Sequence, residues 1–195
     1  MSSTPLIIGV LALQGAYEAQ AQTLRVLGAT PKLVRTPEDL DGIAGLIMPG
    51  GESTTMLKVL ERNGFFEALQ TFVENTPTFG TCAGAILLAK DVESPAQKSL
   101  AALDITVERN AYGRQIDSTI LTAETSLPGG PVEMIFIRAP RITRTGPSVQ
   151  TLATRDGFPT LVRSGHLLAA TFHPELSDDT RVHKLFLDLV SHKKS

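Results

Sequence analysis

The chain has 195 residues, of which 42% are hydrophobic and 19% are charged, a composition typical of one globular domain spanning residues 1–195. Its 18 basic and 20 acidic side chains give a net charge of -2, which argues against a general attraction to nucleic acid or to anionic membranes. One cysteine cannot form an internal disulfide, residues 1–5 carry no basic region, and the apolar run at 6–13 is too short to span a bilayer. We therefore expect a cytoplasmic protein.

The first half of the chain alternates the patterns of strands and helices. Apolar or β-branched runs predict buried strands at residues 6–13, 32–35, 45–48 and 78–81. Helical spacing predicts a helix at residues 17–27, a capped turn at 36–40, two short helices within 54–75 divided near Asn63 and Gly64, and a helix after Cys82. This alternation predicts a doubly wound α/β fold.

The second half reads differently. Residues 91–99 are polar and contain Pro95, which predicts a surface loop. Short segments bounded by turn signals predict partly antiparallel strands near 103–109, 118–124, 132–137, 149–155, 158–163 and 167–172, so the sheet is expected to be mixed. A final helix carries one apolar stripe from Val182 to Val190. His183 and His192 lie off this stripe, and we expect both to be exposed.

The most informative stretch is residues 79–84, which read Phe-Gly-Thr-Cys-Ala-Gly. Glycines two residues to either side of Cys82 match the tight strand-to-helix turn that exposes a nucleophile. At the start of a helix, unpaired N–H groups favour a thiolate, and the N–H of Ala83 could stabilise an oxyanion. The alternative is that Cys82 is a small buried apolar residue, as most free cysteines are.

A base for this cysteine is offered by His173 and Glu175. In an extended chain these two residues face the same way, and Pro174 disfavours a helix beginning at His173. A carboxylate beside one imidazole nitrogen fixes the tautomer and leaves the other nitrogen for the cysteine proton. Alone, the pair is better explained as a surface turn; together with the turn at Cys82 it predicts a catalytic triad.

A third feature is the pair Gly50 and Gly51, which follows a buried strand. Glycines let backbone N–H groups approach a ligand closely, so Gly51 is a candidate for an oxyanion hole. The same stretch can also be read as a plain turn with Ser53 or Thr54 capping the next helix, and it lacks the lysine of a phosphate loop. Open α/β sheets bind ligands beyond the carboxyl ends of their strands, where Gln14 and Cys82 also lie. Histidines scattered around one cysteine predict no metal site.

These motifs together resemble a known family. The stretch around Cys82 and the late His173-Pro174-Glu175 are similar to the triad-type (class I) glutamine amidotransferases, which implies a flavodoxin-like, three-layer αβα fold. Within that group the chain resembles the glutaminase subunits of pyridoxal 5'-phosphate synthase, through residues 9–15, 49–56, 108–115 and 136–140.

The resemblance implies that Cys82 attacks the side-chain amide of L-glutamine to give a thioester and ammonia. His173 would then activate water, with Glu175 orienting it. Glutamine contacts are implied at Gly51, Glu52, Ser53, Arg109, Ile137 and Arg138. A guanidinium suits the α-carboxylate of a free amino acid, although the sequence does not decide which arginine binds it.

The resemblance also implies a partner and no cofactor. The partner is the synthase subunit, which would receive the ammonia, so we expect activity that is low alone and raised by docking, through rearrangement around Gln14 and the peptide of Gly50 and Gly51. Two other readings remain open. One is a glutaminase serving another acceptor, as in imidazole glycerol phosphate synthase, although residues 109–110 and 137–138 argue against it; the other is a catalytically idle subunit that only binds glutamine or a partner.

Overall fold

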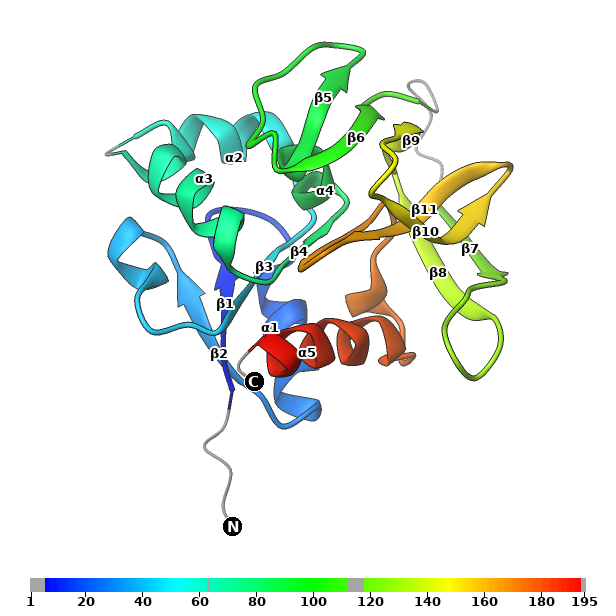
Figure 1. Cartoon of the computed structure of the whole chain (residues 1–195), viewed down its shortest axis with the longest axis horizontal. Helices are drawn as coiled ribbons and strands as arrows, with labels where there is room; N and C mark the ends of the chain where they lie inside the picture. Colours follow the sequence, from blue (N-terminus) through cyan, green and yellow to red (C-terminus); the bar gives the residue numbers. More distant parts are fainter. Residues whose placement is uncertain (1–5, 63, 112–117, 194–195) are drawn as a thin grey trace.

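In the computed structural model, which describes residues 6–62, 64–111 and 118–193, the chain is organised around a seven-stranded sheet (Figure 1). The strand order is β10-β11-β12-β4-β3-β1-β2. The parallel strands are β1 (Ile7–Leu11), β2 (Thr30–Val34), β3 (Gly45–Met48), β4 (Thr78–Thr81) and β12 (Leu167–Ala170). At one edge β10 (Gln150–Arg155) and β11 (Phe158–Ser164) are antiparallel to each other, and β11 is antiparallel to β12. The predicted mixed sheet is confirmed.

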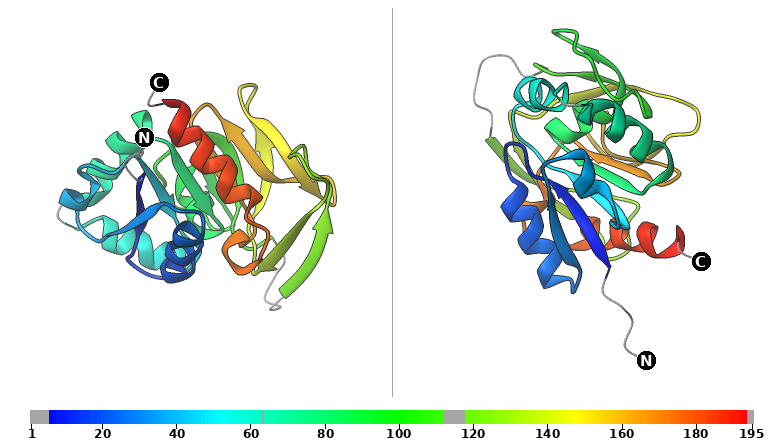
Figure 2. Two further views of the ribbon diagram at one scale, coloured as in Figure 1. Left: turned by 90° about the horizontal axis from the view of Figure 1, so that it is seen from below. Right: turned by 90° about the vertical axis from the view of Figure 1, so that its left-hand side faces the viewer.

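Helices cover both faces of this sheet because its central strands are apolar on both sides. On one face lie α1 (Tyr17–Val26) and α5 (Arg181–Lys193), and on the other α2 (Ser53–Leu60), α3 (Phe65–Asn75) and α4 (Ala83–Leu88). Each face has its own core: Leu24 and Phe186 pack with Val10 on the first, and Leu60 packs with Met48 on the second. Figure 2 shows the sheet between these helices, which confirms the three-layer α/β class. Short 3-10 turns, η1 (Pro37–Leu40) and η2 (Pro174–Leu176), complete the helical elements of the described chain.

Two smaller sheets flank the main one. The first contains β5 (Ala89–Glu93), β6 (Leu103–Glu108) and β9 (Arg141–Thr145), and the second is the pair β7 (Ser118–Ala123) and β8 (Val132–Ile137). The predicted loop at residues 91–99 is wrong at its start, since residues 91–93 belong to β5 and bury Val92 against the core. Strand β9 has no counterpart among the predicted elements; it turns only Ile142 fully inward and leaves its charged neighbours outside.

The expected exposure of His183 is also wrong. Its side chain is fully buried, and its Nε2 lies 2.7 Å from the amide oxygen of Gln20 on α1. His192, the second-last residue of α5, is exposed as expected. Within residues 6–62, 64–111 and 118–193, no helix is long and apolar enough to cross a membrane.

Candidate active site

Cys82 lies on a tight turn between β4 and α4. Its φ of 48° falls in the left-handed region, which is strained for any residue other than glycine. The flanking glycines are required by packing: a Cβ on Gly84 would lie 1.9 Å from the carbonyl oxygen of Met48, and one on Gly80 would lie 2.6 Å from the Gly84 backbone. The backbone N–H of Cys82 donates to the carbonyl of Ala170 on the neighbouring strand, at 2.8 Å. The turn therefore has the form that the sequence predicted for a nucleophile.

His173 and Glu175 follow the end of β12 and form a buried pair. The Nδ1 of His173 lies 2.7 Å from Glu175 Oε1, so Nδ1 carries a proton and donates it to the carboxylate. The backbone N–H of His173 donates to the carbonyl of Ile135, which ties this segment to β8. Burial disfavours the imidazolium, but interactions with Cys82 and Glu175 outweigh that cost and raise the pKa of His173 to about 10.

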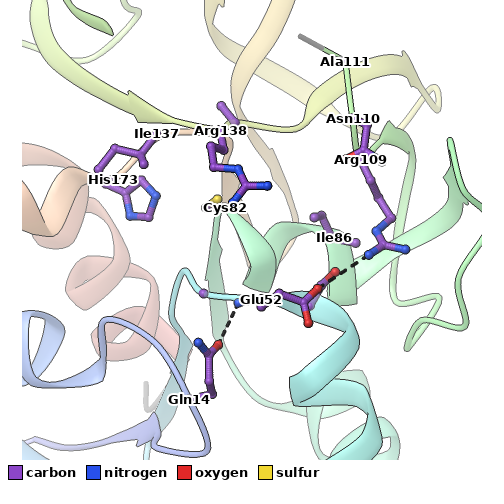
Figure 3. Close-up of a pocket in the computed structure, with 13 residues that line it drawn as sticks. Gln14, Glu52, Cys82, Ile86, Arg109, Asn110, Ala111, Ile137, Arg138 and His173 are labelled. Carbon is purple, nitrogen blue, oxygen red and sulfur yellow. Dashed lines mark hydrogen bonds and ion pairs between the residues drawn. The ribbon is translucent and has the colours of Figure 1, made fainter. Parts of the chain in front are cut away.

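Cys82 and His173 meet at one pocket with a volume of about 340 Å³ (Figure 3). It is lined by Gln14, Gly51, Glu52, Ser53, Cys82, Ile86, Arg109, Asn110, Ala111, Ile137, Arg138, Ala139 and His173. Gly50 lies between the two reactive groups, because a Cβ on it would be 2.3 Å from His173 Cε1 and 3.3 Å from Cys82 Cβ. The carboxyl ends of β1, β3, β4 and β12 thus converge on a cavity that suits a single amino acid.

The loop after β3 is held from the side of α1. The carbonyl oxygen of Gly50 accepts a hydrogen bond from the Ala16 N–H at 3.0 Å, and Gln14 Oε1 accepts one from the Glu52 N–H at 2.7 Å. A Cβ on Gly51 would lie 2.3 Å from Gln14 Oε1, so only glycine fits there. The backbone of the candidate oxyanion loop is therefore fixed by the segment that leads into α1.

Glu52, and not Ser53 or Thr54 as predicted, caps α2. Its carboxylate accepts from the backbone N–H groups of Thr54 at 3.1 Å and Thr55 at 2.8 Å. Partial burial favours the neutral acid, but these hydrogen bonds outweigh it and lower the pKa of Glu52. Ser53 is 3% exposed and donates from Oγ to Gln97 Oε1 at 3.0 Å.

The two arginines of the pocket differ in what they contact. Arg109 Nη2 donates to Thr54 Oγ1 at 2.7 Å and lies 3.8 Å from Glu52 Oε1, so Arg109 is attached to the start of α2. Arg138 points into the pocket near Cys82 (Figure 3), and its guanidinium has no hydrogen-bond or ion-pair partner among the described residues. Its φ of 47° is again left-handed. Arg138 is therefore presented to the pocket by a strained backbone.

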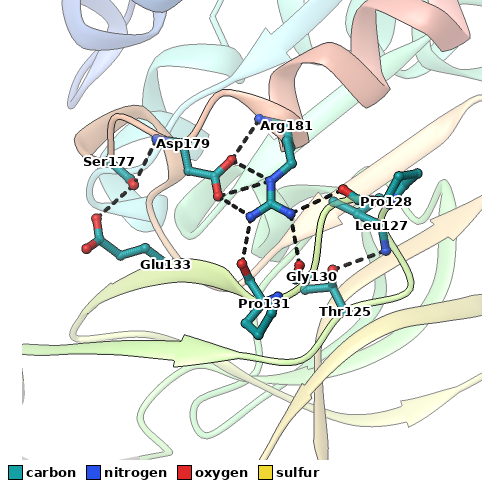
Figure 4. A network of polar contacts seen from close by, with 9 residues as sticks. All are labelled: Thr125, Leu127, Pro128, Gly130, Pro131, Glu133, Ser177, Asp179 and Arg181. Carbon is teal, nitrogen blue, oxygen red and sulfur yellow. Dashed lines mark hydrogen bonds and ion pairs between the residues drawn. The ribbon is translucent and has the colours of Figure 1, made fainter.

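The hairpin that carries Arg138 is fixed to α5 by Arg181 (Figure 4). The Arg181 guanidinium donates to the carbonyls of Pro128 at 3.2 Å, Gly130 at 2.9 Å and Pro131 at 2.6 Å. Asp179 accepts a hydrogen bond from the same guanidinium at 2.6 Å, and this bond fixes the orientation of the Arg181 side chain. Because these carbonyls lie in the turn between β7 and β8, the far end of the hairpin is held in place.

Of the residues predicted from sequence, eight line the pocket: Gly51, Glu52, Ser53, Cys82, Arg109, Ile137, Arg138 and His173. Glu175 lies behind His173, and Ala83 is the first residue of α4, where the N–H has no partner within the helix. Prediction missed Ile86, although its place one helix turn after Cys82 could have revealed it, and it missed Gln97, for which the sequence holds no signal. Residues 112–115 of the motif at 108–115 lie outside the described residues.

An α/β fold with a cysteine on such a turn, a buried His–Glu pair and an amino-acid-sized pocket defines a protein of the glutamine amidotransferase class. The chain belongs to the SNO glutamine amidotransferase family, and the match covers residues 10–192. The family recognised in the sequence is thereby confirmed.

Comparison with individual relatives agrees with this family assignment. The chain is 63% identical over 188 residues to the pyridoxal 5'-phosphate synthase subunit PdxT of Koribacter versatilis, covering 96% of this chain and 97% of that one. It is 50% identical over 185 residues to PdxT of Thermotoga maritima, covering 94% and 98%. A crystal structure of a glutamine amidotransferase is 44% identical, with a TM-score of 0.88 and coverage of 94% and 98%. The PurLQS structure from Thermotoga maritima, at 15% identity, TM-score 0.72 and coverage of 95% and 99%, shares the fold.

Proposed function

We propose that this chain is a single glutaminase domain, residues 1–195, that hydrolyses L-glutamine to L-glutamate and ammonia as a subunit of a pyridoxal 5'-phosphate synthase. The observation that carries the proposal is that Cys82, on a strained turn, shares one pocket with His173, which is hydrogen-bonded to the buried Glu175. The names of the relatives support the pyridoxal phosphate pathway over imidazole glycerol phosphate synthase as the destination of the ammonia.

The first half of the reaction uses the Cys82 thiolate and the His173 imidazolium. The sulfur attacks the amide carbon of glutamine, and the carbonyl electrons move to the oxygen, which the N–H groups of Gly51 and Ala83 stabilise. The tetrahedral intermediate then collapses and breaks the C–N bond. His173 gives its proton to the departing nitrogen, and the products are ammonia and a γ-glutamyl thioester.

The second half uses the neutral imidazole that remains. His173 takes a proton from a water molecule, whose oxygen attacks the thioester carbon, and the C–S bond breaks to release glutamate. Glu175 holds Nδ1–H throughout, so that Nε2 handles the proton in both halves, and it stabilises the imidazolium each time it forms. The raised pKa of His173 agrees with this role, because it keeps the imidazolium available as the acid for the leaving group.

Glutamine binding is assigned to the rest of the pocket. Arg138 has no competing partner among the described residues, so it is the arginine that holds the α-carboxylate of glutamine. Arg109 and Glu52 contact each other and Thr54, so they shape the wall of the pocket together with Ser53. Ile137 supplies apolar surface against the methylene groups of the substrate.

The synthase subunit is the proposed partner. Ammonia released into water at neutral pH is mostly protonated and no longer nucleophilic, so direct transfer within a hetero-oligomer is an advantage. The loop at Gly50 and Gly51 is held by Gln14 and Ala16, which suggests how docking could act: a shift of this segment releases the Gly50 carbonyl and reorients the peptide. A cytoplasmic location is proposed as well, in keeping with the single cysteine.

The test is glutamate release by the purified chain, alone and with the synthase subunit. We expect turnover that rises when the synthase is added. With the synthase present, a glutamine-derived chloroketone should modify Cys82, Cys82→Ala should abolish turnover, and His173→Asn should remove nearly as much, since triad members act as a unit. Binding of glutamine without hydrolysis or modification would instead identify an idle binding subunit. Equal turnover with and without the synthase would refute the proposed control.

A further inference from the structure

Three polar side chains are completely buried behind the turn that carries Cys82. Thr81 at the end of β4, Gln20 on α1 and His183 on α5 are each 0% exposed. His183 Nε2 lies 2.7 Å from Gln20 Oε1, and Gln20 Nε2 lies 3.1 Å from Thr81 Oγ1. The first and last helices of the chain are thus joined by hydrogen bonds to the residue that precedes Cys82.

The direction of these bonds follows from the chemistry of the groups. An amide oxygen can only accept, so His183 carries a proton on Nε2 and donates it to Gln20. The Gln20 amide nitrogen then donates to the Thr81 hydroxyl. Burial lowers the pKa of His183 to about 4, so the ring is neutral at physiological pH, and it packs edge-on against Phe79 with ring centroids 5.8 Å apart. Gln20 is therefore oriented by His183 and in turn orients Thr81.

Stability alone does not explain a polar chain at this position. Buried polar groups lose their bonds to water, and apolar residues of the same size would fill the space without that loss. A hydrogen-bonded chain instead selects one geometry, because its members fit only when donors and acceptors face each other. Such a constraint matters at Cys82, the residue after Thr81, because its left-handed φ of 48° is strained. A strained backbone conformation persists only where the surrounding structure enforces it.

We propose that Gln20 is a positioning residue of the glutaminase: oriented by His183, it holds Thr81 so that the turn presents Cys82 to His173 and to the oxyanion loop. The inference rests on the proposed function, because the position of the sulfur matters only if Cys82 is the nucleophile. None of the three residues lines the pocket, so they act through the backbone at residues 81–82.

Helix α1 contacts the other side of the site as well. Ala16, one turn before Gln20, donates its N–H to the carbonyl of Gly50 at 3.0 Å, and the Gln20 N–H donates to the Ala16 carbonyl at 3.3 Å. One helical turn therefore holds both the oxyanion loop and the nucleophile turn. This turn of α1 fixes the distance between the two parts of the site.

The test compares variants that keep the hydrogen bond with variants that keep the shape. Thr81→Ser and His183→Gln retain the hydroxyl and an N–H near Nε2, whereas Thr81→Val and His183→Phe retain the volume and lose the polar group. In glutamine hydrolysis by the full chain with its synthase subunit, we expect the Thr81→Val and His183→Phe variants to lower kcat by about ten-fold or more, with KM nearly unchanged. A small displacement of the reacting atoms slows the chemical step strongly. Ser and Gln should keep most of the turnover. Residues that only filled the core would give the opposite ranking.

A second measurement separates this inference from the proposed function. Cys82 is the single cysteine, so its alkylation by iodoacetamide reports the accessibility and orientation of the sulfur without any need for glutaminase activity. We expect the Val and Phe variants to alter this rate while Ser and Gln do not. An inactive parent protein would refute the proposed function and leave this readout in place. An active parent with four variants alike in both kcat and alkylation rate would overturn the role of Gln20.

A double variant covers the possibility that the His183 variants fail to fold. Gln20→Leu and Thr81→Val each break the same hydrogen bond, so the double variant should lose little more turnover than either single one. If the two losses simply multiply, Gln20 and Thr81 act independently and the proposal is wrong.

Discussion

Replacement of His173 by Gln should remove a contribution to the free energy of unfolding that depends on pH. The pKa of His173 is raised from its ordinary 6.5 to about 10, through interactions with Cys82 and Glu175 that outweigh the effect of burial. Between these two pH values the folded protein holds a proton that the unfolded chain has lost. The stabilisation is therefore fully present below about pH 6.5 and is lost as the pH rises through 10.

The magnitude follows from the size of this window. Each unit of pKa shift is worth about 1.4 kcal/mol, so the whole window sets a ceiling of roughly 5 kcal/mol. Because His173 is only 7% exposed, solvent screens the interaction little. We expect a measured loss of a few kcal/mol across the window, with a slope on the order of 1 kcal/mol per pH unit.

The assay is urea denaturation followed by circular dichroism, from neutral to alkaline pH, for the parent protein, His173→Gln and Glu175→Gln. The stability gap between the parent and His173→Gln should narrow as the pH rises. Glu175→Gln keeps the shape of the carboxylate and removes its charge, so its own curve should fall less steeply than that of the parent. Parallel curves for all three proteins would show that His173 does not hold an extra proton in the folded state.

Two further predictions concern the arginines of the pocket and the turn at Cys82. Arg138→Ala should raise KM for glutamine about ten-fold to a hundred-fold, as expected for loss of a hydrogen bond between charged groups. Arg109→Ala should raise KM less. If steady-state kinetics showed the larger rise in KM for Arg109→Ala, the roles of the two arginines would be exchanged. Gly84→Ala should destabilise the fold, because the new Cβ would lie 1.9 Å from the Met48 carbonyl oxygen, a clash that costs about 1–3 kcal/mol. This cost outweighs the preference of helices for alanine over glycine, which is about 1 kcal/mol. If urea denaturation showed no loss in the free energy of unfolding, the space beside Gly84 would not be tight.

The sequence predicted best those elements whose cause is local. The apolar run of β1 and the apolar stripe of α5 are periodic signals, and both elements form nearly where they were expected. The turn at Cys82 was equally readable, because the small residues it needs, Gly80 and Gly84, lie two positions away. The pairing of His173 with Glu175 was also predicted, but from an extended chain; in the structure Glu175 lies in the 3-10 turn η2, which begins at Pro174.

The errors arise where the partner is distant along the chain. His183 lies off the apolar stripe of α5 and is buried because it bonds Gln20, which is 163 residues away. Strand β9 carries four charged or polar positions, which are tolerated only because Ile142 is covered by the core. The difference between Arg109 and Arg138 depends on whether Thr54 lies within reach, which no local pattern reveals.

Control by the synthase should act on the oxyanion loop and not on the nucleophile. The raised pKa of His173 reflects contacts with Cys82 and Glu175 that exist within this chain alone, whereas the loop is held by Gln14 and Ala16 at its outer side. Iodoacetamide alkylates a thiolate at a saturated carbon, so this reaction develops no oxyanion. Addition of the synthase should therefore raise glutamine turnover without raising the alkylation rate of Cys82. A proportional rise in both rates would show that the partner activates the sulfur itself, and the control would then belong to the turn at Cys82.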